Sequence, residues 1–257
     1  MNGLKELYNY REMILNLVRK DLRTRFKGSF LGFLWTFVNP LLQLIIYTIV
    51  FSSILRVNVD KFYIYLFVAL VPWIFFTSAM QGGATSIVGN ADLIKKIHFP
   101  RLVLPIATTT AAFMNMVYSM VIVLMALVFS GIGISWHIVY LPAIMILEYF
   151  FVLGITFLFA ALNVYFRDLE HILGIITMAW FYLTPIVYTE EMVPKQYLGL
   201  FSMNPLTHLM GAYRDILYYH RIPDFTTLVS IVIFAVIFLV IGYFTFQKLQ
   251  RNFVEEL

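Results

Sequence analysis

The stretch LPIATTTAAFMNMVYSMVIVLMALVF, residues 104–129, contains no Asp, Glu, Lys or Arg. A helix crosses a bilayer core about 30 Å thick with about 20 apolar residues, so this stretch predicts a membrane-spanning helix. The whole chain has the same character: 61% of its 257 residues are apolar, 12% are charged, and the mean hydropathy is +0.84. Soluble domains carry about 25% charged residues. We therefore expect a multi-span membrane protein with no separate soluble catalytic domain.

On either side of this stretch, further apolar runs with at most one charged residue divide the chain. The six runs are Leu31 to Leu55, Phe62 to Ala79, Leu104 to Phe129, Ile138 to Ala161, Ile172 to Val187 and Phe225 to Phe246. They predict an all-α integral membrane fold with six transmembrane helices in a domain spanning residues 31–257. With the N-terminus inside, 13 of the 18 Lys and Arg lie on the cytoplasmic side. This bias predicts that both termini are cytoplasmic.

Residues 1–30 form a different kind of region, because they hold seven Lys and Arg. Their apolar residues recur at steps of three and four, at Leu7, Tyr10, Ile14, Leu17, Val18 and Leu22. This period predicts an amphipathic helix lying in the membrane interface. A water-facing surface helix is the alternative, but the chain offers no soluble core to bury its apolar stripe.

About 37 residues separate the fifth and sixth predicted spans, and they include Pro194, Pro205 and Pro223. Apolar pieces such as YLGLFSM, residues 197–203, are too short to cross a membrane and too apolar for a free loop. We predict that residues 190–215 form re-entrant helices, which are tolerated where protein or a water-filled cavity surrounds them. A plain extracellular loop is the alternative.

Catalytic motifs are missing from the sequence. There is no GxxxxGK[ST] phosphate loop, no HExxH motif and no paired carboxylate arrangement. We therefore expect no enzyme activity, metal or cofactor on this chain. Glu148 is the one ionisable residue within a predicted span. It is either a polar contact or proton site in a substrate path, or a carboxyl that pairs with a neighbouring helix or is kept neutral by burial.

Two cytoplasmic segments offer contacts for a partner protein. The first, GNADLIKKIHFPR at residues 89–101, predicts a short helix capped by Asn90 or Asp92 and ended by Pro100. An apolar knob ringed by charge suits docking into a groove. The alternative is a membrane-hugging loop. The second is the turn NVYFRDLEHIL, residues 163–173, which offers Arg167 and Asp168.

These segments belong to a longer series of strings that occur in order along the chain. The series is KDLRTRFKGSFLGFLW (20–35), GNADLIKKIHFPR, NVYFRDLEHIL, TPIVY (184–188), and NPLT with AYRD (204–215). Together they resemble the membrane permease subunit of type-2 ABC exporters. More narrowly, they are similar to the polysaccharide and polyol-phosphate export branch, which includes O-antigen and teichoic acid permeases.

The resemblance implies a permease that exports lipid-linked polysaccharide across the bacterial inner membrane. It implies a homodimer bound to two copies of a separate ATPase subunit that carries ATP and Mg, and no nucleic-acid partner. It also implies that residues 90–101 form the coupling helix and that the 163–173 turn is a second contact. The implied ATPase-coupling residues are Asp92, Leu93, Ile94, Lys95, Lys96, Ile97, His98, Arg101, Arg167 and Asp168.

A substrate path can be predicted from the chemistry of a lipid diphosphate sugar. Basic side chains at the inner headgroup level can bind its phosphates. Our candidates are Arg23, Arg25 and Lys27, with binding of anionic lipid as the alternative. Sugar rings pack on aromatic faces, and the candidates for that role are Trp35, Tyr47, Phe51, Trp180, Tyr182 and Tyr188. An interfacial aromatic belt is the alternative for these residues.

Three other functions remain open at the level of sequence. One is a type-2 exporter of drugs or lipids, against which the GSFLGFLW and NPLT to AYRD strings argue. Another is an ion-coupled carrier or channel, which would work without an ATPase. The third is an intramembrane transferase, for which Asp168 and Glu170 are the closest approach to a catalytic pair.

Overall fold

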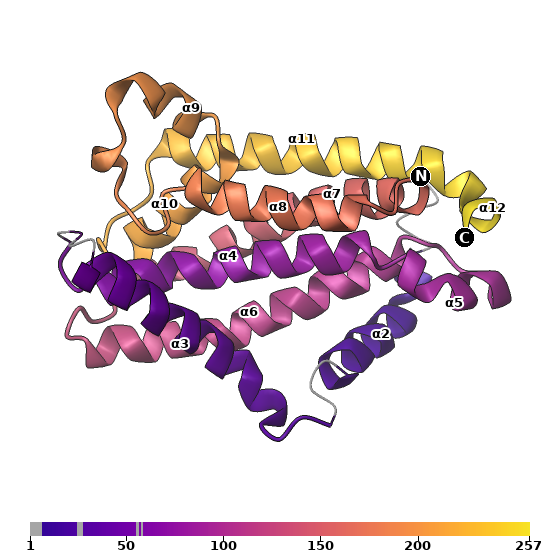
Figure 1. Ribbon diagram of the computed structural model, residues 1–257, viewed down its shortest axis with the longest axis horizontal. Helices are drawn as coiled ribbons and strands as arrows, with labels where there is room; N and C mark the ends of the chain where they lie inside the picture. Colours follow the sequence, from indigo (N-terminus) through magenta and orange to yellow (C-terminus); the bar gives the residue numbers. More distant parts are fainter. Residues whose placement is uncertain (1–6, 25–27, 55–56, 58) are drawn as a thin grey trace.

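The computed structural model describes residues 7–24, 28–54, 57 and 59–257 (Figure 1). Over these residues the chain is helical and contains no strand. The helices are α2 (Arg11–Thr24), α3 (Trp35–Thr48), α4 (Phe62–Ala84), α5 (Ala91–Lys96), α6 (Val103–Phe129), α7 (Leu141–Tyr165), α8 (Leu169–Tyr182), α9 (Leu198–Ser202), α10 (Pro205–Leu217), α11 (Phe225–Leu249) and α12 (Phe253–Glu256). This is the all-α membrane architecture that the apolar runs predict.

Five helical segments in the described part of the chain are long and apolar enough to cross a membrane. They are Gly32–Ser52, Phe62–Ala84, Val103–Phe129, Trp136–Tyr165 and Phe225–Asn252. The remaining predicted span, Ile172 to Val187, is wrong in its bounds, because α8 has 14 residues and ends at Tyr182. Pro185 disfavours helical geometry at Thr184, which lies just after this end. The count of six spans therefore stays a prediction.

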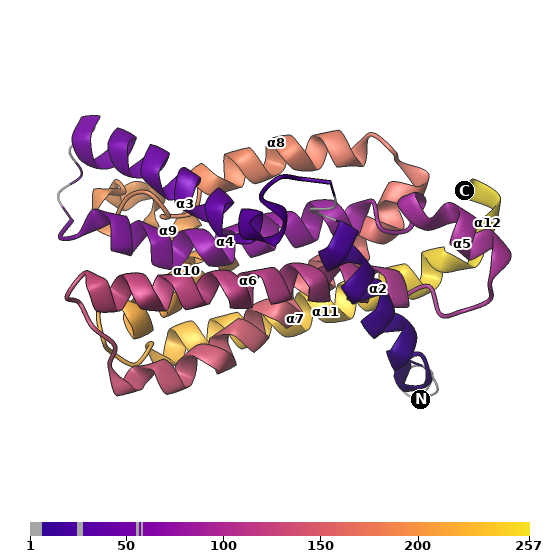
Figure 2. The same ribbon diagram turned by 90° about the horizontal axis from the view of Figure 1, so that it is seen from below.

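Four long helices, α4, α6, α7 and α11, run side by side, and α3 crosses them obliquely (Figures 1 and 2). The two ends of this bundle carry different short elements. The α5 end holds α5, α12 and the turn at residues 166–168, whereas the α9 end holds α9, α10 and the links at residues 130–135 and 183–197. Helix α2 packs against α6 near the α5 end, and its Val18 is buried with Ala107 and Ala111.

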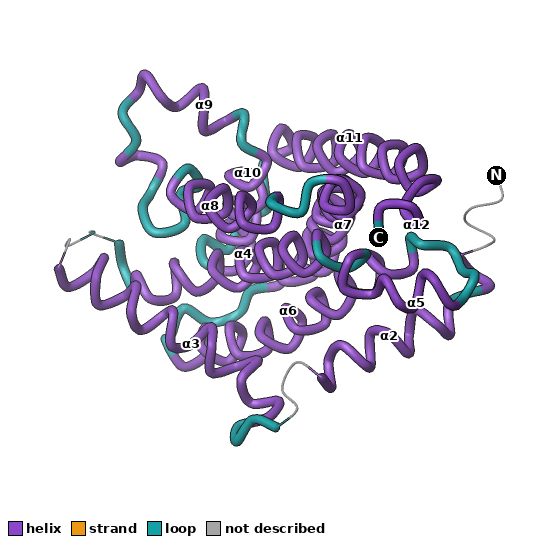
Figure 3. The backbone as a smooth tube through the Cα atoms, turned by 45° about the vertical axis from the view of Figure 1, so that its right-hand side comes forward, coloured by secondary structure: helices purple, strands orange, loops and turns teal. Residues whose placement is uncertain are grey.

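Helix α4 is the centre of the bundle. It contacts α3, α6, α7, α8 and α10, and most of its residues are buried. A helix packed on all sides is apolar all round rather than along one stripe. Figure 3 shows α4 with α6, α7, α8 and α10 around it.

The tightest helix pair is α7 with α11, and two glycines allow it. A Cβ atom at Gly154 would overlap main-chain atoms of Phe238 and Leu239, and one at Gly242 would overlap the carbonyl of Gly154. Small residues let transmembrane helices approach this closely. Because the two backbones are in contact, we treat α7 and α11 as one rigid pair.

Large apolar side chains remain exposed along α3, α8 and α11, for example Ile46, Ile175 and Ile237. Exposed apolar stripes on several long helices are what contact with lipid, or with another membrane subunit, requires.

Candidate functional sites at the two ends of the bundle

Helix α5, the predicted coupling helix, is anchored on one side and free on the other. Ile94 is 8% exposed, whereas Lys95, Lys96 and Ile97 face outward and Ile97 is 53% exposed. Asp92 and His98 are also exposed, and Leu93 is half-buried. The last turn of the helix and Ile97 directly after it therefore present two basic side chains and one apolar side chain at the surface of the α5 end.

Two details of the predicted coupling segment need correction. The helix ends at Lys96, because Ile97 is already extended at φ −131° and ψ 136°, so Pro100 is not what stops it. Asn90 does not cap the helix with its side chain, since its amide donates a 2.8 Å hydrogen bond back to the Ser86 carbonyl. The segment after Lys96 is an irregular loop that leads to α6.

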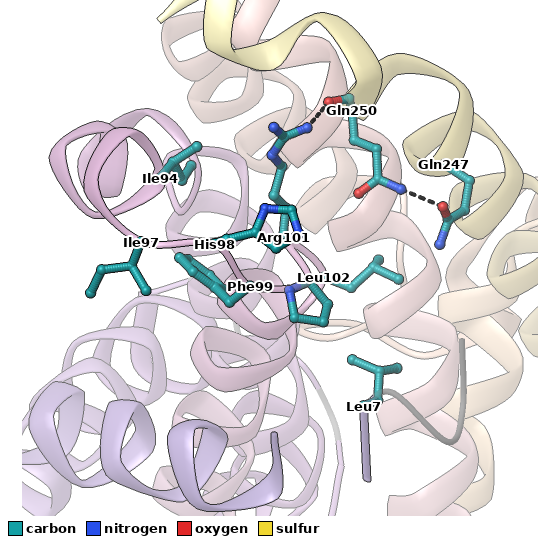
Figure 4. A pocket seen from close by; sticks show the side chains of 10 residues that line it. Leu7, Ile94, Ile97, His98, Phe99, Arg101, Leu102, Gln247 and Gln250 are labelled. Carbon is teal, nitrogen blue, oxygen red and sulfur yellow. Dashed lines mark hydrogen bonds between the residues drawn. The ribbon is translucent and has the colours of Figure 1, made fainter. Parts of the chain in front are cut away.

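Arg101 ties this loop to the C-terminal end of the chain (Figure 4). Its Nη1 donates to the main-chain carbonyl of Gln250, and its guanidinium lies 6.0 Å from the Phe253 ring centroid. Phe253 is fully buried, with its ring edge-on to Phe246 at 5.5 Å. A cavity of about 240 Å³ lies beside this contact, between Ile94 and Gln250. We call the contacts of Arg101 with Gln250 and Phe253 the Arg101 clamp.

The second predicted contact, the turn at residues 166–168, lies at the same end. Phe166, Arg167 and Asp168 are all exposed. Just before the turn, the Tyr165 hydroxyl donates a 2.9 Å hydrogen bond to the Leu249 carbonyl, which fixes the end of α7 to the end of α11. The structure thus brings both predicted cytoplasmic contacts to the α5 end, joined by the C-terminal residues.

The predicted phosphate contacts lie at or near the end of α2. Arg23 is exposed in the last turn of α2. Arg25 and Lys27 lie outside the described residues. Binding of substrate phosphates at this position stays a prediction.

Some of the predicted aromatic residues meet where α3 and α8 approach each other. The Tyr47 ring stacks on Phe181 at 5.3 Å and lies 6.4 Å from Phe51. Tyr182, next to Phe181, is exposed, and its carbonyl accepts a 2.5 Å hydrogen bond from the Tyr188 hydroxyl. Burial raises the pKa of the Tyr188 hydroxyl to about 12.

The two predicted tryptophans have other contacts. The Trp180 indole donates a 3.1 Å hydrogen bond to Asn204 Oδ1 and packs edge-on against Phe76 at 5.3 Å. Trp35, at the start of α3, donates a 2.7 Å hydrogen bond to Ser29 Oγ. Both indoles therefore have partners within the chain.

Asn204 and Arg214 hold α10 in place, and sequence reasoning gave neither a role. Asn204 Oδ1 caps α10 by accepting from the Leu206 amide, while its Nδ2 donates to the Leu183 carbonyl and Thr184 Oγ1. The Asn-Pro pair at the start of the helix was the available signal, since Asn caps and Pro favours the first helical turn.

Arg214 is 4% exposed and joins three segments. Its guanidinium donates to the carbonyls of Pro185 at 2.5 Å, Ile186 at 2.7 Å and Tyr65 at 3.4 Å. It also lies 3.7 Å from the Tyr65 ring centroid, which places a cation over an aromatic face. Arg214 thus fixes the link after α8 to the start of α4.

Glu148, the intramembrane acid, is fully buried in α7 and accepts a 2.6 Å hydrogen bond from the Tyr213 hydroxyl of α10. The contact joins Glu148 to a neighbouring helix, and a role in a substrate path stays a prediction. In the described part of the chain, no cluster of three or more His, Asp or Glu could hold a metal ion.

The sequence profile of the ABC-2 type transporter family matches residues 12–218. The chain belongs to the ABC-2 type transporter family. The match includes α5, the turn at 166–168, Asn204 and Arg214, whereas the C-terminal partners of Arg101 and Tyr165 lie beyond it.

Individual members of the family extend the match to nearly the whole chain. An O-antigen export system permease protein RfbA from Myxococcus xanthus is 35% identical over 99% of this chain and 98% of its own length. One from Klebsiella pneumoniae is 31% identical over 95% of this chain and 94% of its own. The polysialic acid transport protein KpsM from Escherichia coli is 25% identical over 88% and 89%.

Proposed function

We propose that this chain is the permease subunit of an ATP-driven exporter that moves lipid-linked polysaccharide of the O-antigen type across the bacterial inner membrane. The full-length similarity to O-antigen export permeases, at 31–35% identity, is the observation that carries the proposal. The weaker similarity to a polysialic acid transport protein points to the same polymer class and favours it over teichoic acid.

Energy for transport comes from a separate ATPase subunit, because the sequence has no phosphate loop. We assign two copies of this ATPase to a homodimer of the permease. The exposed side of α5, with Lys95 and Lys96, forms together with Ile97 directly after it the surface that docks into the ATPase. The exposed turn at residues 166–168 supplies a second contact on the same side, and the positive-inside bias assigns this side to the cytoplasm.

Force applied at α5 reaches the other end of the bundle through a continuous series of contacts. The Arg101 clamp connects the loop after α5 to the end of α11. Helix α11 moves with α7 because Gly154 and Gly242 let the two backbones pack in direct contact. Helix α7 in turn holds α10 through Glu148 and Tyr213. Movement of packed helices as rigid bodies is a common form of switching, and here it would open and close the path between α3 and α8.

The exposed apolar faces of α3 and α8 support a homodimer whose glycan path lies beside these two helices. Tyr47, Phe51 and Tyr182 lie at this boundary and supply aromatic surface there. Aromatic faces let sugar rings slide past without fixing them through directional hydrogen bonds.

Reconstitution tests the proposal. Proteoliposomes that contain the permease with its ATPase should move a lipid-linked O-polysaccharide in the presence of ATP and Mg, read out by access of an externally added glycosidase. Matched vesicles hold the permease alone, or the complex with a hydrolysis-deficient ATPase, and should not move polymer. Movement by the permease alone would overturn the assignment in favour of a carrier or channel, and ATP-driven movement of lipid without glycan would favour a lipid exporter.

A further inference from the structure

A cavity of about 830 Å³ lies at the α9 end, between α10, the beginning of α11 and the segment 189–202. Its volume lies within the range of about 300–1,000 Å³ that is typical of small-molecule sites. None of the aromatic residues predicted to line the glycan path contributes to its wall. The cavity is therefore distinct from the boundary between α3 and α8.

Three tyrosines form one side of the cavity. The ring of Tyr218 is perpendicular to that of Tyr219, at 4.9 Å and 87°, and lies 5.5 Å from that of Tyr65. The hydroxyls of Tyr65 and Tyr218 donate to the carbonyls of Tyr188 and Asp60, so both rings are fixed. Tyr219 is 48% exposed, with the Arg221 guanidinium 5.0 Å from its ring centroid, and the part of the ring that stays exposed is the surface it offers to a ligand. A rigid aromatic platform of this kind packs against the apolar C–H face of a sugar ring.

The arginines around the cavity are engaged by other groups of the protein, whereas several carboxylates are exposed to a ligand. The guanidinium of Arg214 is directed at main-chain carbonyls, and that of Arg221 is paired with Asp215 at 2.7 Å. The carboxylates of Glu190, Glu191 and Asp224 are exposed at the cavity wall. Carboxylates accept hydrogen bonds from hydroxyls and repel anions.

We propose that this cavity binds a short segment of neutral, hydroxyl-rich glycan, with Tyr219 as its stacking surface and Glu190 and Glu191 as hydroxyl acceptors. The same carboxylates disfavour anionic sugars such as uronates. The site rests on the proposed function in one respect, namely that exported polymer leaves the protein at the α9 end. Through this site, the α9 end binds the glycan as it leaves the protein and favours neutral over anionic glycan.

The first test measures saccharide binding to the complex in lipid nanodiscs, which avoids detergents with sugar headgroups. The probe is maltohexaose, followed by saturation-transfer NMR. Tyr219→Ala should weaken binding by about tenfold, the effect expected for one lost stacking contact. Tyr219→Phe should bind as the wild type does. Trp136→Ala is the matched control, because Trp136 is an exposed aromatic residue at the same end but outside the cavity.

The second test addresses charge with hexagalacturonate as the anionic probe. Wild type should bind it more weakly than maltohexaose, and the double variant Glu190→Gln with Glu191→Gln should bind it about tenfold better than wild type does. Undiminished maltohexaose binding by Tyr219→Ala, an equal loss in Trp136→Ala, or equal binding of both probes by wild type would each overturn the site.

Failure of the site and failure of the proposed function are distinguishable in the same preparations. Each sample is also assayed for ATP-driven movement of lipid-linked polymer. Transport without saccharide binding would leave the exporter assignment standing and remove the site. Saccharide binding without ATP-driven transport would leave the site standing and remove the exporter assignment.

Discussion

Tyr213 donates a 2.6 Å hydrogen bond to the carboxylate of Glu148, and both side chains are fully buried between α10 and α7. The next residue, Arg214, bonds instead to carbonyls of the link after α8 and of α4. Two consecutive residues therefore hold α10 from two sides. Helix α10 cannot shift relative to α7 unless the bond between Glu148 and Tyr213 breaks.

We predict that Glu148 and Tyr213 are energetically coupled. Glu148→Gln keeps an oxygen that accepts the Tyr213 hydrogen bond and should cost less than Glu148→Ala, which leaves the buried hydroxyl unpaired. Tyr213→Phe should destabilise the protein by about 1 kcal/mol. Thermal unfolding of the single and double variants gives a double-mutant cycle, with an expected interaction of about 1 kcal/mol. Strict additivity of Glu148→Ala and Tyr213→Phe would contradict the coupling.

Arg214→Lys should be strongly destabilising although it preserves the charge. A single ammonium cannot reproduce the planar fork that reaches the carbonyls of Pro185, Ile186 and Tyr65. We expect a loss on the order of 3 kcal/mol, seen as a lower melting temperature of the purified protein. Arg221→Gln is the control, because its ion pair with Asp215 involves an exposed guanidinium and should be worth about 0.2–1 kcal/mol. Similar losses of melting temperature in the two variants would argue against a structural role for the hydrogen bonds of the buried Arg214 guanidinium.

The long helices were predictable from sequence because an uncharged run of 20 or more residues has few other structures available to it. Residues 104–129 and 225–246 both fall inside observed helices, α6 and α11. The apolar run 172–187 was harder to interpret, because hydropathy counts Leu183 and Ile186 as span residues although the helix ends at Tyr182. Composition alone does not decide where a helix ends.

The candidate sites were less predictable than the fold, because their contacts join residues far apart in sequence. Trp180 bonds Asn204, Arg101 bonds Gln250, and Arg214 reaches Tyr65. No periodicity links such positions, although the segments that contain Arg101, Asn204 and Arg214 were singled out. The cavity beside Tyr219 left no pattern in the sequence, since its wall comes from five separate segments.

Substitution of Gly242 by valine should separate α7 from α11. The added side chain overlaps the backbone of α7 at Gly154, and overpacking of this kind costs about 1–3 kcal/mol. Gly174→Ala is the control, because a Cβ there meets nothing within 4 Å and alanine favours the helix by about 1 kcal/mol. Melting temperatures should fall for Gly242→Val and stay level or rise for Gly174→Ala. An unchanged melting temperature for Gly242→Val would contradict the close packing.

Ile97→Asp should weaken docking of the ATPase without unfolding the permease, because Ile97 is 53% exposed. Loss of an apolar anchor worth about 2 kcal/mol corresponds to about 30-fold in affinity. Co-purification and binding isotherms with the ATPase measure the effect, and the melting temperature of the permease alone checks its fold. Ile94→Asp makes the contrast, since Ile94 is buried and its substitution should lower the melting temperature itself. Full affinity in Ile97→Asp would remove the residue that follows α5 from the docking surface.

Arg101→Ala should separate docking from transport. The exposed residues of α5 are untouched, so the ATPase should still bind and hydrolyse ATP. The loop after α5 loses its contacts with Gln250 and Phe253, so its movement no longer reaches α11. We expect ATP hydrolysis within about twofold of wild type and transport reduced by about tenfold or more, a loss of about 1.4 kcal/mol in coupling. Arg101→Lys retains a donor and should recover part of the transport. Hydrolysis and transport that fall together would show that Arg101 supports docking rather than the connection to α11.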